Sequence, residues 1–397
     1  MADALDGPVR PLIVRPLVKK ILVVAGEDSG DMYMGRLIGH LSGLMEGVLF
    51  EGVGGPRMRE AGATTLYDIT ALSSVGLASA MSKMGVFISA LRDLKSRIAS
   101  GEYDAVILVD YPDFNLRIAR YADTAGIPVF YYVAPQFWAW RRGRVKVVRK
   151  CVDMMFVVFP FEEEFYKVRG VNAQFLGHPI LDELDFNVDR GAVRAELGAR
   201  PNELLLGLLP GSRRGEVERM YPDMLSAVRI IRANKPVKVV TMCAGSMDDG
   251  FIRELAADHG EEPLVVRGRT WEVMNACDFL LCKSGTSTLQ ATLAGTPMAV
   301  VYKADSFSYM LAKALSHVKW AAIPNLLARR EIAPELIQWK VTPQNVASSA
   351  LPYLIDPAKR EEMRRELIKL RPGLGERGAS SRAAVAIVEF LKKLKKD

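Results

Sequence analysis

The chain lacks the features by which several classes of protein are recognised. Its 397 residues include only four cysteines and four histidines, with no CxxC pair and no metal-ligand spacing. The scattered cysteines predict buried free thiols in a reducing compartment, and we expect no metal and no other cofactor. No segment resembles a signal peptide or reaches the roughly 18–20 uncharged apolar residues of a membrane-spanning helix. We therefore expect a cytoplasmic protein that at most rests on a membrane.

Motifs for nucleic acids and common nucleotides are also missing. The basic residues are dispersed and no aromatic RNA-binding run occurs, which argues against a nucleic-acid partner. Neither GxGxxG nor a P-loop follows any expected strand, which argues against a dinucleotide or a nucleoside triphosphate. The charge balance is 53 basic against 46 acidic residues, a net +7. This modest excess favours phosphate-bearing small molecules or an anionic membrane surface.

Short apolar runs alternate with turns and helical stretches along the whole chain. Hydrophobic residues make up 49% of it and charged residues 25%, enough for real cores, and the length favours two domains. Two successive series of βαβ units predict an α/β fold with two doubly wound Rossmann-like domains facing a cleft. We expect an N-terminal domain at 1–185, a C-terminal domain at 186–375, and a basic helix at 376–397 that packs back on the first domain. The polar stretch 182–202 is interpreted as the linker.

The segment AVILVDYPDFN, residues 105–115, combines a buried strand with an acidic end. Five consecutive apolar residues are followed by Asp110, and Pro112 then ends the strand. Ligands of open α/β sheets bind beyond the carboxyl ends of strands, so Asp110 is a candidate catalyst. On position alone it is equally a helix cap, and Asp113, nearer the start of the expected helix 114–125, is the better cap.

Three turns place backbone N–H groups at the start of a helix. The first is GEDSGD at 26–31, which suits an anion or a sugar but is equally a plain tight turn. In the second half, Gly211-Ser212-Arg213 and Ser284-Gly285-Thr286 both follow strands. Together these two turns suit a diphosphate, because helix dipoles and a guanidinium neutralise its charge without a metal.

Two further segments have more than one interpretation. The stretch 75–98 is basic and amphipathic, with apolar residues beyond one core-facing stripe, so it fits either a membrane interface or the core. Aromatic residues alternate with arginines at 135–144, as on a phosphate or nucleic-acid surface or in a packed helix with snorkelling arginines. His178, before a proline at a strand end, is interpreted as a loop hydrogen-bonding residue.

The ordered motifs of the chain resemble those of one family, the lipid-A-disaccharide synthases, over roughly residues 20 to 355. The matching segments are GEDSGD at 26–31, GVGGPRM at 52–58, VDYPDFN at 109–115, PQFWAWR at 135–141, FPFE at 159–162, GHP at 177–179, LLPGSRRGEVE at 208–218, SGTSTLQ at 284–290 and IPNLLARRE at 323–331. Members of this family are inverting GT-B glycosyltransferases of lipid A and lipopolysaccharide biosynthesis at the cytoplasmic face of the inner membrane.

The resemblance implies that the domain at 1–185 is the acceptor and lipid side and that the domain at 186–375 binds the UDP-sugar. It also implies a reaction and a set of site residues. The donor would be UDP-2,3-diacylglucosamine and the acceptor 2,3-diacylglucosamine 1-phosphate, whose 6-hydroxyl would form a β-1,6 linkage with release of UDP. Asp110 and Arg213 would be the critical residues, with Asp110 as general base. The remaining expectations are Gly211, Ser212, Ser284, Gly285, Thr286, Gln290 and Asn325 for the donor; Gly26, Glu27, Ser29, Gly30 and Asp31 on the acceptor side; and Leu77, Met81, Met84 and Phe87 at an anionic membrane surface.

Other functions are compatible with the same sequence. They are another GT-B UDP-sugar transferase acting on a glycolipid, a UDP-sugar epimerase, and a catalytically silent UDP-sugar- or lipid-binding relative. The presence of both Asp110 and Arg213 argues against the silent relative. In contrast, Gln290 stands where the family pattern has a glutamate, and an amide cannot accept both ribose hydroxyl protons as a carboxylate does.

Overall fold

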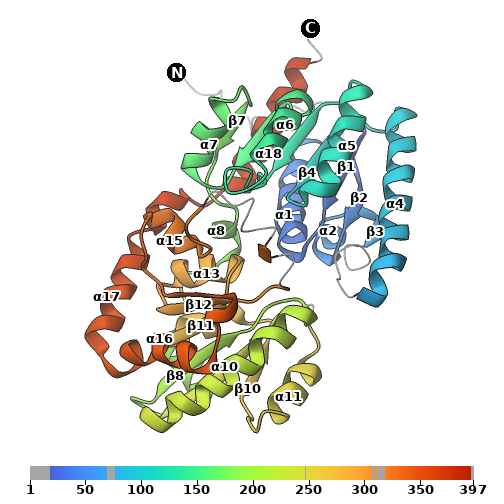
Figure 1. Cartoon of the computed structure of the whole chain (residues 1–397). Helices are drawn as coiled ribbons and strands as arrows, with labels where there is room; N and C mark the ends of the chain where they lie inside the picture. Colours follow the sequence, from blue (N-terminus) through green and yellow to red (C-terminus); the bar gives the residue numbers. More distant parts are fainter. Residues whose placement is uncertain (1–17, 69–76, 246, 306–308, 311–317, 395–397) are drawn as a thin grey trace, which may run out of the picture.

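The computed structural model describes residues 18–68, 77–245, 247–305, 309–310 and 318–394, without the side chains of 77–84. Two α/β domains lie one above the other in Figure 1, each built on a fully parallel sheet. The prediction of two doubly wound domains is therefore confirmed. No helix in the described ranges is long and apolar enough to cross a membrane.

The N-terminal domain contains a seven-stranded sheet in the order β3-β2-β1-β4-β5-β6-β7. Its strands are β1 Lys20–Ala25, β2 Leu49–Gly54, β3 Thr64–Asp68, β4 Ala105–Val109, β5 Val129–Tyr132, β6 Met154–Val157 and β7 Ala173–Phe175. Its helices are α1 Asp28–Leu44, α2 Pro56–Glu60, α4 Leu77–Ala99, α5 Pro112–Thr124, α6 Val145–Cys151 after the 3₁₀ turn η1 Arg142–Arg144, α7 Pro160–Lys167 and α8 Ile180–Glu183. The strand order reverses between β1 and β4, which makes that point the expected ligand-binding edge.

The C-terminal domain repeats this plan with six strands in the order β10-β9-β8-β11-β12-β13. The strands are β8 Leu204–Leu209, β9 Val237–Cys243, β10 Leu264–Arg267, β11 Phe279–Lys283, β12 Met298–Tyr302 and β13 Glu335–Ile337. The helical elements are α9 Arg190–Glu196, α10 Arg214–Asn234, α11 Asp249–Ala257, α12 Thr270–Ala276, α13 Thr286–Ala294, α15 Ile323–Ala328, η2 Gln338–Lys340, α16 Pro343–Ile355, α17 Pro357–Ile368 and η3 Arg371–Leu374. Here the order reverses between β8 and β11.

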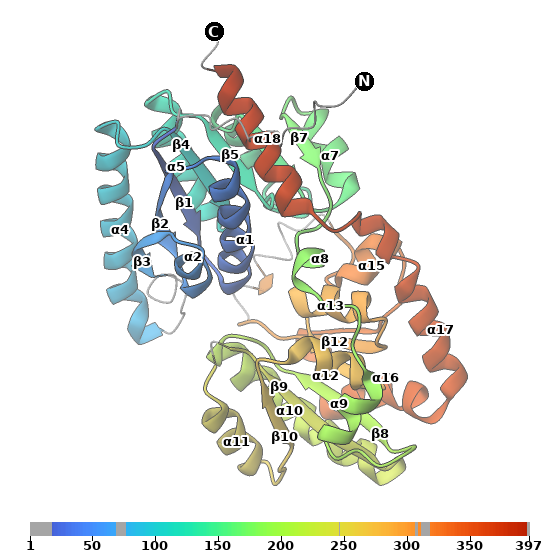
Figure 2. The ribbon, with the colours of Figure 1, turned by 180° about the vertical axis from the view of Figure 1, so that it is seen from behind.

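The last helix, α18 Ala379–Leu394, leaves the C-terminal domain and packs against α1 of the N-terminal domain (Figure 2). The carboxylate of Asp182, at α8, fixes its start by accepting the backbone N–H and the hydroxyl of Ser380 at 3.0 and 2.9 Å. Farther along, the rings of Phe390 and Phe130 meet edge to face. The chain therefore crosses between the domains twice, which ties them together at one side of the cleft.

The polar stretch 182–202 is more than a linker. It contains α9, which packs on α12 of the C-terminal domain. Arg190 and Arg194 of α9 both pair with Asp278, at 2.6 and 2.9 Å. The polar composition of this stretch reflects ion pairs that attach it to the domain surface.

The aromatic residues of the 135–144 segment have packing roles. Phe137 is fully buried, and the indole N–H of Trp138 donates to buried Glu162 at 2.7 Å. Arg141 lies over the ring of Trp140, with 4.5 Å from its guanidinium carbon to the ring centre. Of the two interpretations of this segment, packing is the one that the structure supports.

Candidate active site

A cavity of about 860 Å³ lies between the two domains, where the starts of three helices meet. Two turns at the switch point of the C-terminal sheet line one side of it, and the start of α1 lines the other. Of the predicted site residues, the lining includes Glu27, Ser29, Gly211, Ser212, Arg213, Ser284, Gly285, Thr286 and Gln290. The structure therefore brings most of the predicted donor residues into one cavity.

The two C-terminal-domain turns expose backbone N–H groups to this cavity. Gly211 and Gly285 have φ angles of 131° and 146°, which residues with a side chain rarely adopt. Among the described residues, neither α10 nor α13 has a side-chain cap. The starts of both helices, with their first-turn N–H groups and positive dipole ends, thus line the cavity and suit an anionic ligand.

Two basic and two acidic side chains form a chain of ion pairs along the cavity wall. Arg213 of the C-terminal domain pairs across the cleft with Glu27 of the N-terminal domain. Arg213 also lies 3.8 Å from Glu216, which in turn pairs with Lys283 at 3.1 Å. The second carboxylate oxygen of Glu216 is buried without a hydrogen-bond partner. An anionic ligand would compete with these carboxylates for both cations.

Asp110 follows β4 at the switch point of the N-terminal sheet, next to these charges. It is not part of the cavity lining, but its carboxyl interacts electrostatically with Glu27 and Arg213. Burial, and then the negative charge of Glu27, raise the pKa of Asp110 to about 6, against the opposing effects of a hydrogen bond from the Tyr111 backbone and of Arg213. The carboxylate can therefore accept a proton near neutral pH.

Asp113 does not cap the following helix, so that prediction is wrong. The N-cap of α5 is Tyr111, and Pro112 occupies the first helical position. Asp113 lies in the first turn, where it pairs with Arg144 and with Arg141 at 3.2 Å. A carboxylate there is favourable to the helix dipole, and the proline at the first position marked the helix start in the sequence.

Three predicted acceptor-side residues have backbone-packing or capping roles. A side chain at Gly26 would collide with the ring of Tyr111, and one at Gly30 would press on Val109 at 3.2 Å. The carboxylate of Asp31 is buried and accepts N–H groups of Gly55, Arg57 and Met58 at 2.7, 2.9 and 3.1 Å. Asp31 therefore fixes the start of α2.

Asn325, a predicted donor residue, is fully buried and lies outside the cavity lining. Its amide donates to Ala333 and Glu335, each at 2.8 Å. Glu335 also accepts the N–H of Ala321, whose carbonyl accepts the Ser284 hydroxyl at 2.9 Å. Asn325 thus supports the Ser284 turn from behind.

Sequence reasoning missed several residues of the cavity wall. Lys283 directly precedes the SGT turn, and Glu216 belongs to the GSRRGEVE motif, so both had a local signal. Tyr302, at the end of β12, had none beyond its strand end. Within the described ranges, no cluster of three or more histidine, cysteine or acidic residues could hold a metal ion.

The other predicted residues have the following environments. All four cysteines are buried and free, as predicted. His178 is buried, its Nδ1 accepts the N–H of Ile180 at 3.1 Å, and burial lowers its pKa to about 3, so it acts as a neutral loop residue. Phe87 packs edge-on against Phe114. The side chains of Leu77, Met81 and Met84 lie outside the described residues.

Comparison with known sequences identifies relatives over nearly the whole chain. The profile of the family described as lipid-A-disaccharide synthetase matches residues 21–389. A lipid-A-disaccharide synthase of Geobacter metallireducens is 39% identical over 376 residues, which cover 94% of this chain and 98% of the relative. One from Myxococcus xanthus is 38% identical over 373 residues, covering 94% and 97%.

Solved structures similar to this one share its fold at low sequence identity. A UDP-GlcNAc 2-epimerase from Neisseria meningitidis, bound to UDP-GlcNAc, gives a TM-score of 0.64 at 12% identity and covers 93% of this chain and 100% of its own. A calicheamicin glycosyltransferase gives 0.58 at 15% identity and covers 96% and 100%. These likenesses establish the two-domain GT-B architecture.

Proposed function

The chain belongs to the lipid-A-disaccharide synthetase family, and on that premise we propose how its cleft carries out the transfer. It is a glycosyltransferase of lipid A disaccharide formation with a UDP-sugar as substrate. We propose UDP-2,3-diacylglucosamine as donor and 2,3-diacylglucosamine 1-phosphate as acceptor. The products are then the β-1,6-linked disaccharide 1-phosphate and UDP.

Asp110 acts as the general base in this proposal. The acceptor 6-hydroxyl gives its proton to the Asp110 carboxylate while its oxygen forms a bond to the anomeric carbon of the donor. The bond from that carbon to the diphosphate breaks on the opposite face, and UDP leaves with the electron pair, so the configuration inverts. The supporting observation is a carboxyl with a pKa of about 6 at the switch point, facing Glu27 and Arg213.

The leaving diphosphate is stabilised from the C-terminal domain. Arg213 and Lys283 supply two positive charges, and the starts of α10 and α13 supply N–H groups and aligned dipoles. Together they take up the negative charge that develops on UDP without a metal ion. Gln290 and the hydroxyls of Ser284 and Thr286 also line the cavity and complete the donor side.

The test of this mechanism is disaccharide formation by the purified full-length chain from the two proposed substrates. Asp110→Asn should lose at least about 10²-fold in kcat, because the amide cannot accept the proton. Asp113→Asn, three residues away in the same motif, is the matched control and should keep near-normal activity.

Each other outcome has a defined meaning. An active Asp110→Asn enzyme would refute the role of Asp110 as base. UDP release without disaccharide would indicate another acceptor, and UDP binding without turnover would indicate a silent relative.

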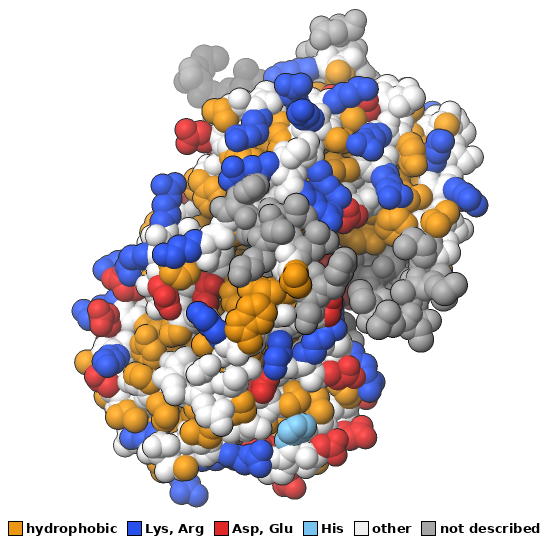
Figure 3. Space-filling model, in the orientation of Figure 1, with side chains coloured by type: hydrophobic (Ala, Val, Ile, Leu, Met, Phe, Trp, Pro, Cys, Tyr) orange, Lys and Arg blue, Asp and Glu red, His pale blue; other side chains and the backbone are white. Residues whose placement is uncertain are grey.

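We further propose that the N-terminal domain rests on the anionic cytoplasmic face of the inner membrane, through α4 and the basic surface beside it. Helices α4, α5 and α6 form one outer layer. Among the described side chains of this layer, the exposed cations are Arg92, Lys95, Arg117, Arg120, Lys146, Arg149 and Lys150. In Figure 3, basic side chains are spread over the upper domain with few acidic ones among them. Such a surface attracts anionic lipid, and the apolar side chains of α4 would insert at its edge.

Liposome flotation tests the membrane proposal. Met81→Ser combined with Met84→Ser should reduce binding to anionic vesicles several-fold and leave the thermal unfolding temperature unchanged. Val168→Ser removes an apolar side chain that is 71% exposed elsewhere on the same domain, and it should have no effect. Equal flotation of the double variant and the wild type would refute the role of α4.

A further inference from the structure

The backbone at Asp110 has an unusual conformation. Asp110 and the next residue, Tyr111, both have positive φ angles, 43° and 46°. Left-handed backbone is strained for a non-glycine residue, and a bulky residue such as tyrosine tolerates it poorly. Such a conformation persists only where the surrounding structure holds it.

Two side chains hold this turn through its carbonyl groups. Asn115, on the first turns of α5, donates its amide to the carbonyls of Val109 at 3.0 Å and Asp110 at 2.7 Å. Tyr131, on β5, donates its hydroxyl to the same Asp110 carbonyl. Both lone pairs of that carbonyl are therefore used, by donors from a helix and from the neighbouring strand.

Holding the turn in this way leaves a polar atom unsatisfied. The side chains of Asn115 and Tyr131 are both fully buried, and the amide oxygen of Asn115 has no hydrogen-bond partner. An unpaired buried acceptor destabilises a fold, and an apolar residue of similar size would avoid that cost. Burial also raises the pKa of Tyr131 far above its usual range, so its hydroxyl remains a donor at neutral pH.

We propose that Asn115 and Tyr131 are positioning residues, which fix the left-handed backbone of Asp110 so that its carboxyl is directed toward the acceptor hydroxyl. The inference rests on the proposed function of Asp110 as the base. Neither side chain needs to touch a substrate, because each acts on the main chain of the residue that does. A displacement of a reacting group by about 1 Å can lower a rate by about 10²-fold, which sets the scale of the expected effect.

The experiment compares Tyr131→Phe and Asn115→Ala with the full-length wild type in the disaccharide assay. Tyr131→Phe removes one hydroxyl and should lower kcat about 5- to 20-fold; Asn115→Ala removes both amide bonds and should lower it about 10- to 100-fold. Because the diphosphate contacts are untouched, KM for the donor and Kd for UDP should stay within twofold of the wild type. A carboxyl released from its buried position should also show a lower apparent pKa in the pH dependence of kcat/KM.

The matched control is Tyr221→Phe in the C-terminal domain. Tyr221 is as fully buried as Tyr131, and its hydroxyl shares a hydrogen bond with Thr241 at 2.8 Å. This variant should lose stability similar to that of Tyr131→Phe and keep its kcat. The comparison separates an effect on the orientation of Asp110 from a general loss of stability.

The possible failures are distinguishable. If folded Tyr131→Phe and Asn115→Ala keep kcat within twofold while Asp110→Asn is inactive, the positioning role is refuted and the base survives. If Asp110→Asn is active, the role of Asp110 as base is refuted, and the positioning role, which depends on it, is refuted as well. Should Asn115→Ala fail to fold, Tyr131→Phe alone decides the question.

Discussion

At the scale of single residues, the site depends on Glu27, which affects both sides of the cleft. Its carboxylate pairs with Arg213, and its negative charge helps to raise the pKa of Asp110. One side chain thus links the cation that would bind the donor diphosphate to the acid that would activate the acceptor. Occupation of Arg213 by a diphosphate leaves Glu27 as an unpaired anion beside Asp110, which strengthens Asp110 as a base.

This link predicts the pH dependence of kcat/KM, which reports on the free enzyme. As the proposed base, Asp110 must be ionised to act, so kcat/KM should rise as the pH passes through about 6 and be constant above it. Glu27→Gln removes the negative charge that raises the pKa of Asp110. It also frees Arg213 from its ion pair, and the positive charge of Arg213 lowers the pKa of Asp110. Both effects shift the rising limb to lower pH.

The measurement compares the pH profiles of the wild type and Glu27→Gln, because the phosphate of the acceptor itself has a pKa of about 6. The ionisation of the acceptor phosphate contributes equally to both profiles, so a difference between them reports a change in the pKa of the enzyme group. Glu218→Gln removes an equal charge from an exposed pair with Arg214 and should leave the profile unchanged. A limb that does not move in Glu27→Gln would contradict the coupling.

Single residues also show how far sequence reasoning reaches. Asp110 was recognisable because an apolar run ends there, and Arg213 because a glycine turn follows a strand. The capping role of Asp31 was hidden, since its partners Gly55 to Met58 are more than 20 residues away in the chain. The supporting role of Asn325 was hidden because its connection to the Ser284 turn runs through Ala321, which is 37 residues from Ser284 in the chain. Long-range hydrogen bonds leave no local pattern.

At the scale of elements, the close approach of the β1–α1 turn to the β4–α5 turn sets the shape of the acceptor side. A Cβ atom on Gly26 would lie 2.2 Å from the Tyr111 ring. Tyr111 directly follows Asp110 in the chain, and its ring stacks on Phe114, with 5.7 Å between ring centres. The Gly26 backbone thus packs directly against the residue that flanks Asp110.

Gly26→Ala should therefore displace Tyr111 and with it Asp110. We expect a loss of about 1–3 kcal/mol in unfolding free energy from overpacking. We also expect a fall in kcat of at least about tenfold, because Asp110 moves with Tyr111. Denaturant unfolding and the disaccharide assay measure the two effects.

Gly39→Ala in α1 is the contrasting control. Gly39 is exposed in the helix interior and has nothing within 4 Å of an added Cβ. Alanine should stabilise the helix by about 0.5–1 kcal/mol and leave kcat unchanged. A Gly26→Ala enzyme with normal kcat would show that the two turns can separate without cost to Asp110.

The elements themselves were predictable where they are long and apolar. The apolar run at 105–109 coincides with β4, and the apolar runs at 204–209 and 298–302 form β8 and β12. The short strands β3, β10 and β13 escaped detection, because each is an edge strand of only 5, 4 or 3 residues. Helix α9 escaped because ion pairs hold it in place and its apolar face is small. Edge elements are therefore where the sequence pattern carries least information.

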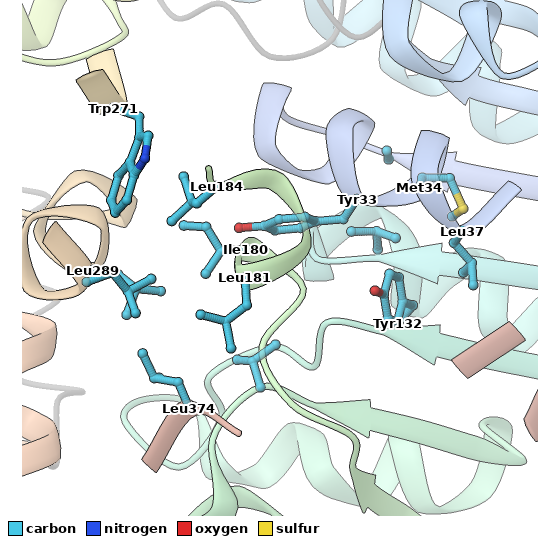
Figure 4. Close-up of a cluster of buried hydrophobic side chains, with 14 of the residues drawn as sticks. Tyr33, Met34, Leu37, Tyr132, Ile180, Leu181, Leu184, Trp271, Leu289 and Leu374 are labelled. Carbon is cyan, nitrogen blue, oxygen red and sulfur yellow. The ribbon is translucent and has the colours of Figure 1, made fainter. Parts of the chain in front are cut away.

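At the scale of the whole molecule, one buried hydrophobic cluster runs through both domains. Figure 4 shows residues at α8 in its middle, with side chains of α1 and β5 on one side and of α12 and α13 on the other. The labelled residues are Ile180, Leu181 and Leu184 in the middle, Tyr33, Met34, Leu37 and Tyr132 in the N-terminal domain, and Trp271, Leu289 and Leu374 opposite. The helices α1 and α13 thus meet this shared core behind the ends that line the cavity.

The shared core predicts that the domains unfold together. Calorimetry of the wild type should show one transition, although two separate domains would commonly give two. Leu181 is only 6% exposed, and Leu181→Ala should lower the unfolding free energy by about 2–5 kcal/mol and split or broaden that transition. Leu225→Ala, in a cluster confined to the C-terminal domain, should cost a similar amount and keep a single transition.

The same variant connects the core to catalysis. In the proposed mechanism, transfer needs Asp110 of one domain and Arg213 of the other at a fixed separation. We expect the packing of α1 and α13 on the α8 segment to set the distance between the two helix starts. Leu181→Ala should therefore also raise KM for the donor several-fold at a temperature where the enzyme is folded, because the cleft samples wider openings. Leu225→Ala should not. Two well-separated transitions in the wild type, or an unchanged KM in Leu181→Ala, would mean that the domains move independently and that substrates alone bring the two half-sites together.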